Sequence, residues 1–280
     1  MNLIQALFMG LVQGLTEFLP VSSSGHLVLS SSLYKFFTNN EFLVNSSEEV
    51  FFDIMLHVGT LLAVFLFFKD DIIKIIKAFI DGIKNRDFSG TEAKLSLFIA
   101  GGTIFTILVA FPLKGISEKL INLPWVVGIF LFITGCILYA GEFVSEHTKE
   151  KTGEMNWKKA ILMGIAQGLA ALPGISRSGS TIATGIFLGL DRVTCARYSF
   201  LLSIPIIVGA SIFYPILELN LSEILAYNWV SIVAGFIVSF VSGYFCIKYF
   251  LKFLSKHSMK VFAYYCWIVG LATFVFFKFF

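Results

Sequence analysis

Charged residues are scarce in this sequence of 280 residues: they make up 14% of it, whereas a soluble domain carries about 25%. Hydrophobic residues make up 57%, and the mean hydropathy is +0.84. Several stretches of about 18 residues or more are almost free of charge, which is the length needed to cross a bilayer. These stretches lack the alternating polarity of outer-membrane barrel strands. The composition therefore predicts an all-α polytopic membrane protein.

Cysteine and concentrated positive charge are also scarce. The four cysteines have no C-x-x-C or Cys/His spacing, which favours inert buried thiols over disulfides or metal ligands. The net charge of +3 is spread over loops and does not indicate a nucleic-acid partner. The first residues, MNLIQALFMGLVQ, have no basic region and continue into Glu17, so we expect mature structure there and no removable signal peptide.

The sequence contains an internal repeat with an offset of 154 residues. The segment from Ala6, ALFMGLVQGLTEFLPVSSSGH, aligns without a gap with AILMGIAQGLAALPGISRSGS from Ala160. The repeat predicts one integral membrane domain over 1–280, with repeat 1 at about 1–143 and repeat 2 at about 155–280. The residues of the first segment that recur are Ala6, Met9, Gly10, Gln13, Gly14, Leu15, Ser22, Ser24 and Gly25.

Each repeat begins with a broken pair of short apolar segments. The first pair is 2–18 and 25–37, joined through LPVSSSG, and the second is 158–171 and 179–190, joined through LPGISRSG. Proline, glycine and serine would leave backbone groups without partners in lipid. Short arms with a polar break predict two re-entrant helical hairpins. Ordinary interfacial or core helices are the alternative.

Six longer apolar segments predict six transmembrane helices, three after each hairpin. A unit of one hairpin and three spans must insert its second copy upside down, because three is odd. The sequence therefore predicts an inverted-topology repeat, with the two polar loops facing each other. The predicted spans are 50–68, 95–113, 124–143, 193–217, 228–250 and 260–280.

The charges of the connecting loops orient these segments. Lysine and arginine dominate the loops 69–94 and 144–159 and the turn near 252–260, whereas 38–49 and 218–227 carry only acidic charges. Because basic loops stay in the cytoplasm, we expect the first hairpin to enter from outside and the second from the cytoplasm. The individual charges include Glu41 and Glu223 on the acidic side, and Lys149 and Lys151 on the basic side.

The first hairpin carries a carboxylate at membrane depth. Gln13 and Glu17 are four residues apart and share one helical face. A carboxylate in hydrocarbon needs an opposite charge, a metal or water, so both residues are candidate metal ligands, and Gln13 is also a candidate substrate-binding residue. An interfacial residue or a protonated structural acid is the alternative for Glu17.

A serine run follows this carboxylate. Ser22, Ser23, Ser24 and Gly25 precede a helix, and a helix N-terminus with free N–H groups binds anions. His26 lies in the first turn of that helix, where a neutral imidazole could bind a proton or a metal. A plain N-cap is the alternative.

The second hairpin carries different chemistry. Glu17, Ser23 and His26 become Ala171, Arg177 and Ser180 at the repeat offset. Arg177 adds a guanidinium, whose planar fork suits phosphate oxygens. One half thus offers acid–base and metal-binding groups, and the other a clamp for an anion. The candidate residues of this clamp are Arg177, Ser176, Ser178 and Gly179.

Two further patterns have simpler interpretations. Gly10/Gly14 and Gly164/Gly168 form G-x-x-x-G, which we interpret as close helix packing. Asp53 and His57 are again four residues apart, at the outer end of a span. Lining of the site and an interfacial position are equally good interpretations of this pair.

Both polar motifs resemble those of the undecaprenyl-pyrophosphate phosphatases, also called bacitracin-resistance proteins. The first family motif, Glu/Gln-x-x-x-Glu followed by Pro-x-Ser-Ser-(Ser/Thr)-Gly-His, is similar to Gln13–Glu17 and Pro20–His26. The second, Pro-Gly-x-Ser-Arg-Ser-Gly, is similar to Pro173–Gly179. Many members have glutamate where this chain has Gln13, which leaves the metal ligands less defined.

The resemblance implies an enzyme of the bacterial inner membrane with six spans and two re-entrant hairpins, its site opening to the outer face. It would hydrolyse the C55 isoprenyl diphosphate carrier lipid to the monophosphate, for reuse in cell-wall synthesis, and confer bacitracin resistance. A divalent cation, Mg²⁺ or Ca²⁺, would be its cofactor. Homodimer formation is left open.

The catalytic hypothesis assigns roles to four residues: Glu17, Ser23, His26 and Arg177. Arg177, the loop amides and the cation would neutralise the diphosphate, and Glu17 would bind the ion or act as base. Ser23 is the preferred nucleophile, assisted by His26, although attack by a metal-activated water or by His26 itself stays open. A transporter or flippase of phosphorylated lipid or a small anion is the rival function, and a structural scaffold is a third.

Overall fold

The protein is all-α in the part that the computed structural model describes, which is residues 2–38, 47–147, 154–219 and 221–279. Glu41, Lys149 and Lys151, which contributed to the predicted loop charges, lie outside these residues. The helices in the described part are α1 (Leu3–Thr16), α2 (Ser23–Thr38), α3 (Ser47–Phe67), α4 (Lys69–Asn85), α5 (Thr91–Leu120), α6 (Pro124–His147), α7 (Trp157–Leu169), α8 (Arg177–Phe187), α9 (Arg192–Glu218), α10 (Leu221–Ala226), α11 (Trp229–Leu254) and α12 (Lys260–Phe279).

Six of these helices are long and apolar enough to cross a membrane: α3, α5, α6, α9, α11 and α12. They coincide with the six predicted spans. The largest difference is α5, which runs to Leu120 instead of ending near residue 113, because Pro112 is accommodated inside the helix. Large apolar side chains such as Phe111 and Leu108 are 78% and 62% exposed. Such exposure suits contact with lipid.

The prediction of a loop over 69–94 is wrong, because α4 occupies most of it. Isoleucines recur every three or four residues from Ile72 to Ile83, which is the pattern of an amphipathic helix. The interleaved charges hide this helix from a search for uncharged stretches. Arg86 ends it in the left-handed conformation, with φ of 54°. The predicted acidic loop 218–227 likewise contains the short helix α10.

Each predicted broken pair consists of two helices that pack on each other, α1 with α2 and α7 with α8. The chain leaves helical conformation between Thr16 and Ser23, and again between Leu169 and Arg177. Left-handed residues turn both loops: Ser22 has φ of 68° and Gly174 has φ of 98°. Glycine adopts this conformation without the steric cost that a serine carries, so Ser22 is a strained position in the first loop.

The two broken pairs pack against the long helices in equivalent ways. Helix α1 packs on α11, α7 packs on α5, and α6 packs on α12. A Cβ at Gly10 would lie 2.5 Å from the carbonyl oxygen of Gly235, and one at Gly164 would overlap the carbonyl of Gly102. These backbones touch because no side chain separates them. The interpretation of the G-x-x-x-G motifs as close helix packing is confirmed.

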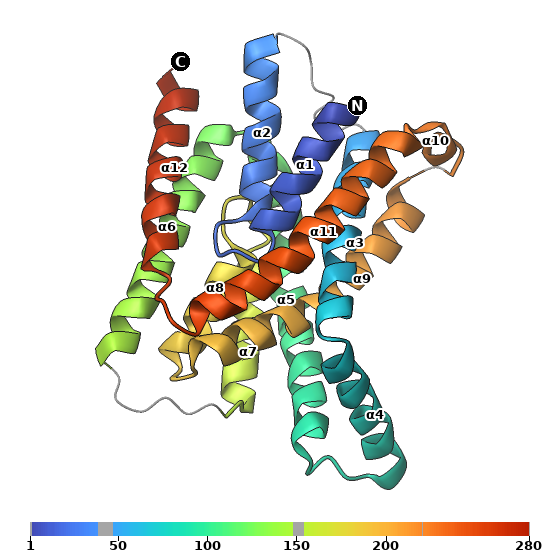
Figure 1. Ribbon diagram of the computed structural model, residues 1–280, viewed down its shortest axis with the longest axis vertical. Coiled ribbons are helices and arrows are strands. Elements are labelled where there is room, and N and C mark those ends of the chain that lie inside the picture. Colours follow the sequence, from blue (N-terminus) through green and yellow to red (C-terminus); the bar gives the residue numbers. More distant parts are fainter. Residues whose placement is uncertain (1, 39–46, 148–153, 220, 280) are drawn as a thin grey trace.

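The loop of each broken pair meets the loop of the other near the centre of the bundle (Figure 1). The Ser178 hydroxyl donates to the carbonyl of Leu19 at 2.9 Å, and the Ser22 hydroxyl donates to the carbonyl of Ile175 at 3.4 Å. The helix ends carrying the predicted catalytic groups are thereby brought together, as the repeat predicted.

Candidate active site

Glu17 is the centre of a buried polar cluster at the end of α1. Only 6% of its side-chain surface is exposed. Its Oε2 atom accepts hydrogen bonds from Ser23 Oγ at 2.7 Å and from Gln13 Nε2 at 2.9 Å. Its Oε1 atom is in direct contact with the guanidinium of Arg177. Both carboxylate oxygens are therefore occupied, which is how a charge persists in an apolar bundle.

Arg177 comes from the other half of the chain, at the N-terminus of α8. Its NH2 group contacts Glu17, and its NH1 group donates to the carbonyl of Ser199 on α9 at 3.4 Å. The side chain remains 17% exposed. The guanidinium thus has a fixed position on a side chain that is not fully buried, which suits a group that binds an anion.

The serines of the two loops divide into two groups. Ser22 and Ser176 cap α2 and α8, accepting hydrogen bonds from the N–H groups of Gly25 and Gly179 at 3.3 and 3.0 Å. The plain N-cap interpretation therefore accounts for both caps. Ser23 is instead partly exposed and bonded to Glu17. Phosphate binding by the loop residues Ser22, Ser24, Gly25, Ser176, Ser178 and Gly179 stays a prediction.

His26 is held by two partners. Its Nδ1 atom lies 2.8 Å from the carbonyl of Ser22, so that nitrogen carries the proton, and its Nε2 atom lies 2.7 Å from the hydroxyl of Tyr265 on α12. The two rings also stack, with centroids 5.7 Å apart. Tyr265 therefore occupies the nitrogen that a neutral His26 would use to accept a proton.

His57 lies closer to the carboxylate than sequence patterns indicated. Its Nε2 atom is 3.7 Å from Glu17 Oε2, while its Nδ1 atom lies 2.8 Å from the carbonyl of Asp53. Of the two interpretations of the Asp53/His57 pair, the geometry favours lining of the site for His57. The i, i+4 spacing of two polar residues in an apolar span was the signal for it.

Other residues around the site gave no signal in the sequence. Thr134 on α6 donates to the carbonyl of Gly174 and accepts from the N–H of Ser176, both at 3.0 Å, which fixes the second loop. Tyr265 and Ser199 are similarly isolated polar groups in apolar helices. They contact the site only through the packing of distant segments.

The cluster fits a divalent cation in part. Among the described residues, no three Asp, Glu, His or Cys side chains are grouped to hold a metal by themselves. Gln13 is fully buried, and its Oε1 atom has no hydrogen-bond partner within the part of the chain that the structure describes. Mg²⁺ is commonly held by one or two carboxylates together with phosphate oxygens of a substrate. Glu17 and the free oxygen of Gln13 fit such a shared donor set.

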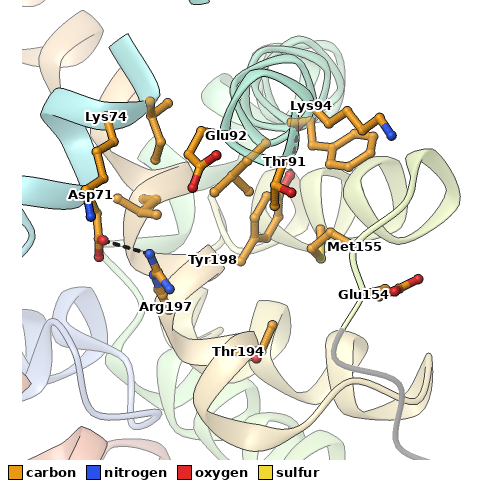
Figure 2. Close-up of a pocket in the computed structure, with 14 residues that line it drawn as sticks. Asp71, Lys74, Thr91, Glu92, Lys94, Glu154, Met155, Thr194, Arg197 and Tyr198 are labelled. Carbon is orange, nitrogen blue, oxygen red and sulfur yellow. Dashed lines mark hydrogen bonds and ion pairs between the residues drawn. The ribbon is translucent and has the colours of Figure 1, made fainter. Parts of the chain in front are cut away.

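A separate cavity of about 510 Å³ lies between α4, α5 and α9 (Figure 2). Three basic and three acidic side chains line it, and Arg197 pairs with Asp71 at 2.7 Å. Balanced charge of this kind does not concentrate positive potential as an anion site does. None of the predicted site residues lines this cavity, so the Glu17 cluster is the candidate active site.

The two broken helix pairs supply a carboxylate, a guanidinium and a serine hydroxyl. Six helices of membrane-spanning length surround these groups, so the fold is that of a polytopic membrane protein with a polar centre. The chain belongs to the family described as bacitracin resistance protein BacA, which it matches over residues 6–272.

Proteins named undecaprenyl-diphosphatase are similar to this chain along almost its whole length. The one from Halothermothrix orenii is 40% identical over 273 residues, which cover 97% of this chain and 96% of the relative. Those from Methanobrevibacter smithii and Methanosphaera stadtmanae are also 40% identical, with 98% of each chain covered. The predicted family resemblance is confirmed.

Proposed function

We propose that this protein is an undecaprenyl-diphosphatase, which hydrolyses the diphosphate of an isoprenyl carrier lipid to a monophosphate and inorganic phosphate. The names of relatives with 40% identity support this substrate. The observation that carries the proposal is the Glu17 carboxylate, which contacts Arg177 from one loop and Ser23 from the other. A carboxylate that can act as a base, a serine hydroxyl and a guanidinium that can bind phosphate thus lie within one hydrogen-bonded cluster.

Recognition of the diphosphate is assigned to Arg177 and the two helix N-termini. Helices α2 and α8 both begin at the meeting loops, and N–H groups at a helix start attract phosphate oxygens. When a diphosphate enters, Arg177 can exchange its contact with Glu17 for phosphate oxygens, since a guanidinium pairs with either anion. Glu17 then loses its contact with Arg177, and its Oε2 atom, which accepts from Ser23, can act as the base.

Ser23 is the proposed nucleophile. Its hydroxyl already donates to Glu17 at 2.7 Å, so the carboxylate is placed to take the proton as Oγ attacks the terminal phosphorus. The phosphoanhydride bond breaks, the isoprenyl monophosphate leaves, and the phosphoryl group stays on Ser23. Water then hydrolyses the phosphoserine, with Glu17 returning the proton to the serine oxygen. His26, oriented by Tyr265, helps to position the loop.

A divalent cation, Mg²⁺ or Ca²⁺, would be held by Glu17 and Gln13 and would neutralise the charge of the diphosphate oxygens. Gln13 supports this assignment independently, because its amide nitrogen already bonds to Glu17 and leaves the amide oxygen free.

The site is proposed to open to the outer face of the inner membrane, between two re-entrant hairpins of an inverted repeat. Support comes from the equivalent packing of α1 on α11 and of α7 on α5, and from the mutual packing of α6 and α12. A pseudo-two-fold axis that exchanges the repeats would produce this pattern. The lipid tail would lie between helices. Homodimer formation stays a prediction.

Phosphate release from isoprenyl diphosphate by the detergent-solubilised protein tests the function. No gradient exists in detergent, so turnover that needs a divalent cation supports a phosphatase, whereas binding without turnover supports the transporter. Glu17→Ala, His26→Ala and Arg177→Ala are each expected to reduce release about 100-fold or more. A well-folded variant that retains most of its activity would remove that residue from the site.

A further inference from the structure

Two helices place matching pairs of polar residues beside each other at the site. Gln13 and Glu17 are one turn apart on α1, and Asp53 and His57 are one turn apart on α3. The two helices pack together and run in the same direction in Figure 1. Glu17 Oε2 and His57 Nε2 are 3.7 Å apart. Gln13 and Asp53 therefore lie on the same side of this contact, each about 6 Å along its helix.

Gln13 and Asp53 each carry a buried oxygen that accepts no hydrogen bond from a described residue. Among the described residues, Oε1 of Gln13 and Oδ1 of Asp53 have no hydrogen-bond partner. A buried acceptor left unpaired destabilises the fold. Two such oxygens on adjacent helices are therefore expected to share a ligand that supplies positive charge.

The orientation of Gln13 makes this expectation specific. Its amide cannot be reversed to satisfy the free oxygen, because Nε2 already donates to Glu17 at 2.9 Å. The oxygen is therefore fixed as an acceptor, and the neighbouring carboxylates add negative charge. Oxygen donors of this kind, amide and carboxylate together, are those that hard divalent cations prefer.

The repeat provides an internal comparison. Gln167, at the position equivalent to Gln13, is also buried with a free Oε1 atom, but its Nε2 atom donates to the hydroxyl of Thr106 and the carbonyl of Leu202. Ala171 stands where the first repeat has Glu17. An unpaired amide oxygen alone thus does not define a cation site. The two carboxylates, Glu17 and Asp53, distinguish the first repeat.

We propose that Asp53 is a ligand of the divalent cation, whose donor set is divided between α1 (Gln13 and Glu17) and α3 (Asp53). This inference rests on the proposed function for the identity of the cation. It moves part of the cation site from the first hairpin to a membrane-spanning helix. Together with the phosphate oxygens of a substrate, three protein oxygens would suit the octahedral preference of Mg²⁺.

Binding of Mn²⁺ to the substrate-free, detergent-solubilised full-length protein tests this directly. Electron paramagnetic resonance measures the free Mn²⁺ signal during titration. Asp53→Asn keeps the shape of the side chain and removes its charge, and we expect it to weaken Mn²⁺ binding at least tenfold. Asp81→Asn removes the same charge from an exposed position on α4 and should leave the affinity unchanged. Equal affinities of wild type and Asp53→Asn would overturn the proposal, as would no Mn²⁺ binding by wild type.

A second variant covers the case in which Asp53→Asn does not fold. Asp53→Cys replaces an oxygen donor by a thiolate, which prefers Cd²⁺, so the ratio of Cd²⁺ to Mn²⁺ affinity should rise at least tenfold. Asp81→Cys is the matched control, and an unchanged ratio in Asp53→Cys contradicts the proposal. Phosphate release is measured separately: loss of Mn²⁺ affinity in Asp53→Asn without any turnover by wild type would reject only the proposed function.

Discussion

At the scale of single residues, Glu17 and Arg177 form the contact that connects the two halves. The pair is almost completely buried, with 6% and 17% of the side-chain surfaces exposed. Removing one partner of such a pair leaves an uncompensated charge, which destabilises far more than removing both. The stability of the fold and the proposed catalysis would therefore depend on the same two side chains, and the two contributions can be separated by variants.

The first prediction separates them. Arg177→Met should lower the melting temperature markedly, because Glu17 loses its counter-charge. Adding Glu17→Gln should restore much of the loss, since neither charge of the pair remains, while phosphate release stays at least about 100-fold below wild type. Thermal unfolding in detergent and a phosphate assay measure the two effects. A double variant as unstable as Arg177→Met would show that the pair acts mainly through packing.

The second prediction concerns the nucleophile. Ser23→Ala should abolish release by removing the attacking oxygen, whereas a metal-activated water would leave a measurable rate. Brief incubation with substrate labelled at the terminal phosphate should leave label on the wild-type protein and none on Ser23→Ala. Ser30→Ala, two turns further along α2, is the matched control and should retain labelling. Label on Ser23→Ala would exclude this serine as nucleophile.

The sequence predicted the members of the cluster that lie in the repeated motifs. Glu17, Ser23 and Arg177 were found because polar residues between apolar segments are unusual. Tyr265 could not be found, because it is one polar group in an apolar helix and reaches His26 across 239 residues of chain. His57 is an intermediate case. The sequence showed its spacing from Asp53, but it did not show that His57 lies next to Glu17.

At the scale of helices, hydrophobic length predicted the membrane spans and missed α4. A search for uncharged stretches detects helices that are apolar on every side. Helix α4 escapes it because isoleucines and lysines are interleaved along its sequence. Ile76 and Ile83 remain 52% and 57% exposed on it.

The third prediction tests the close approach of α1 and α11. A Cβ at Gly10 would lie 2.5 Å from the carbonyl oxygen of Gly235, closer than real contacts allow, whereas one at Gly115 on α5 meets nothing within 4 Å. Gly10→Ala should therefore lower the melting temperature, at a cost of about 1–3 kcal/mol. Gly115→Ala, also inside a helix, should raise it slightly through helix propensity. Equal effects of the two variants would mean that α1 is not held against α11.

At the scale of the whole molecule, the repeat explains why residues 160 positions apart meet. The two loops bond directly to each other, because the Ser178 hydroxyl donates to the carbonyl of Leu19 and the Ser22 hydroxyl donates to the carbonyl of Ile175. The offset in the sequence predicted this meeting without any knowledge of distances. Orientation in the membrane is a separate matter, which depends on loop charges and not on internal contacts.

The last prediction tests that orientation by cysteine labelling. Lys84→Cys lies at the basic end of α4, and Glu223→Cys lies in α10 within the acidic loop; each is introduced after replacement of the four native cysteines by alanine. An impermeant maleimide applied to intact cells should label Glu223→Cys only, and applied to inverted membrane vesicles it should label Lys84→Cys only, because lysine-rich segments stay in the cytoplasm. Parallel phosphate assays show that each variant is folded. Labelling of both positions from the same side would contradict an odd number of spans between them, and with it the inverted arrangement that the proposed site requires.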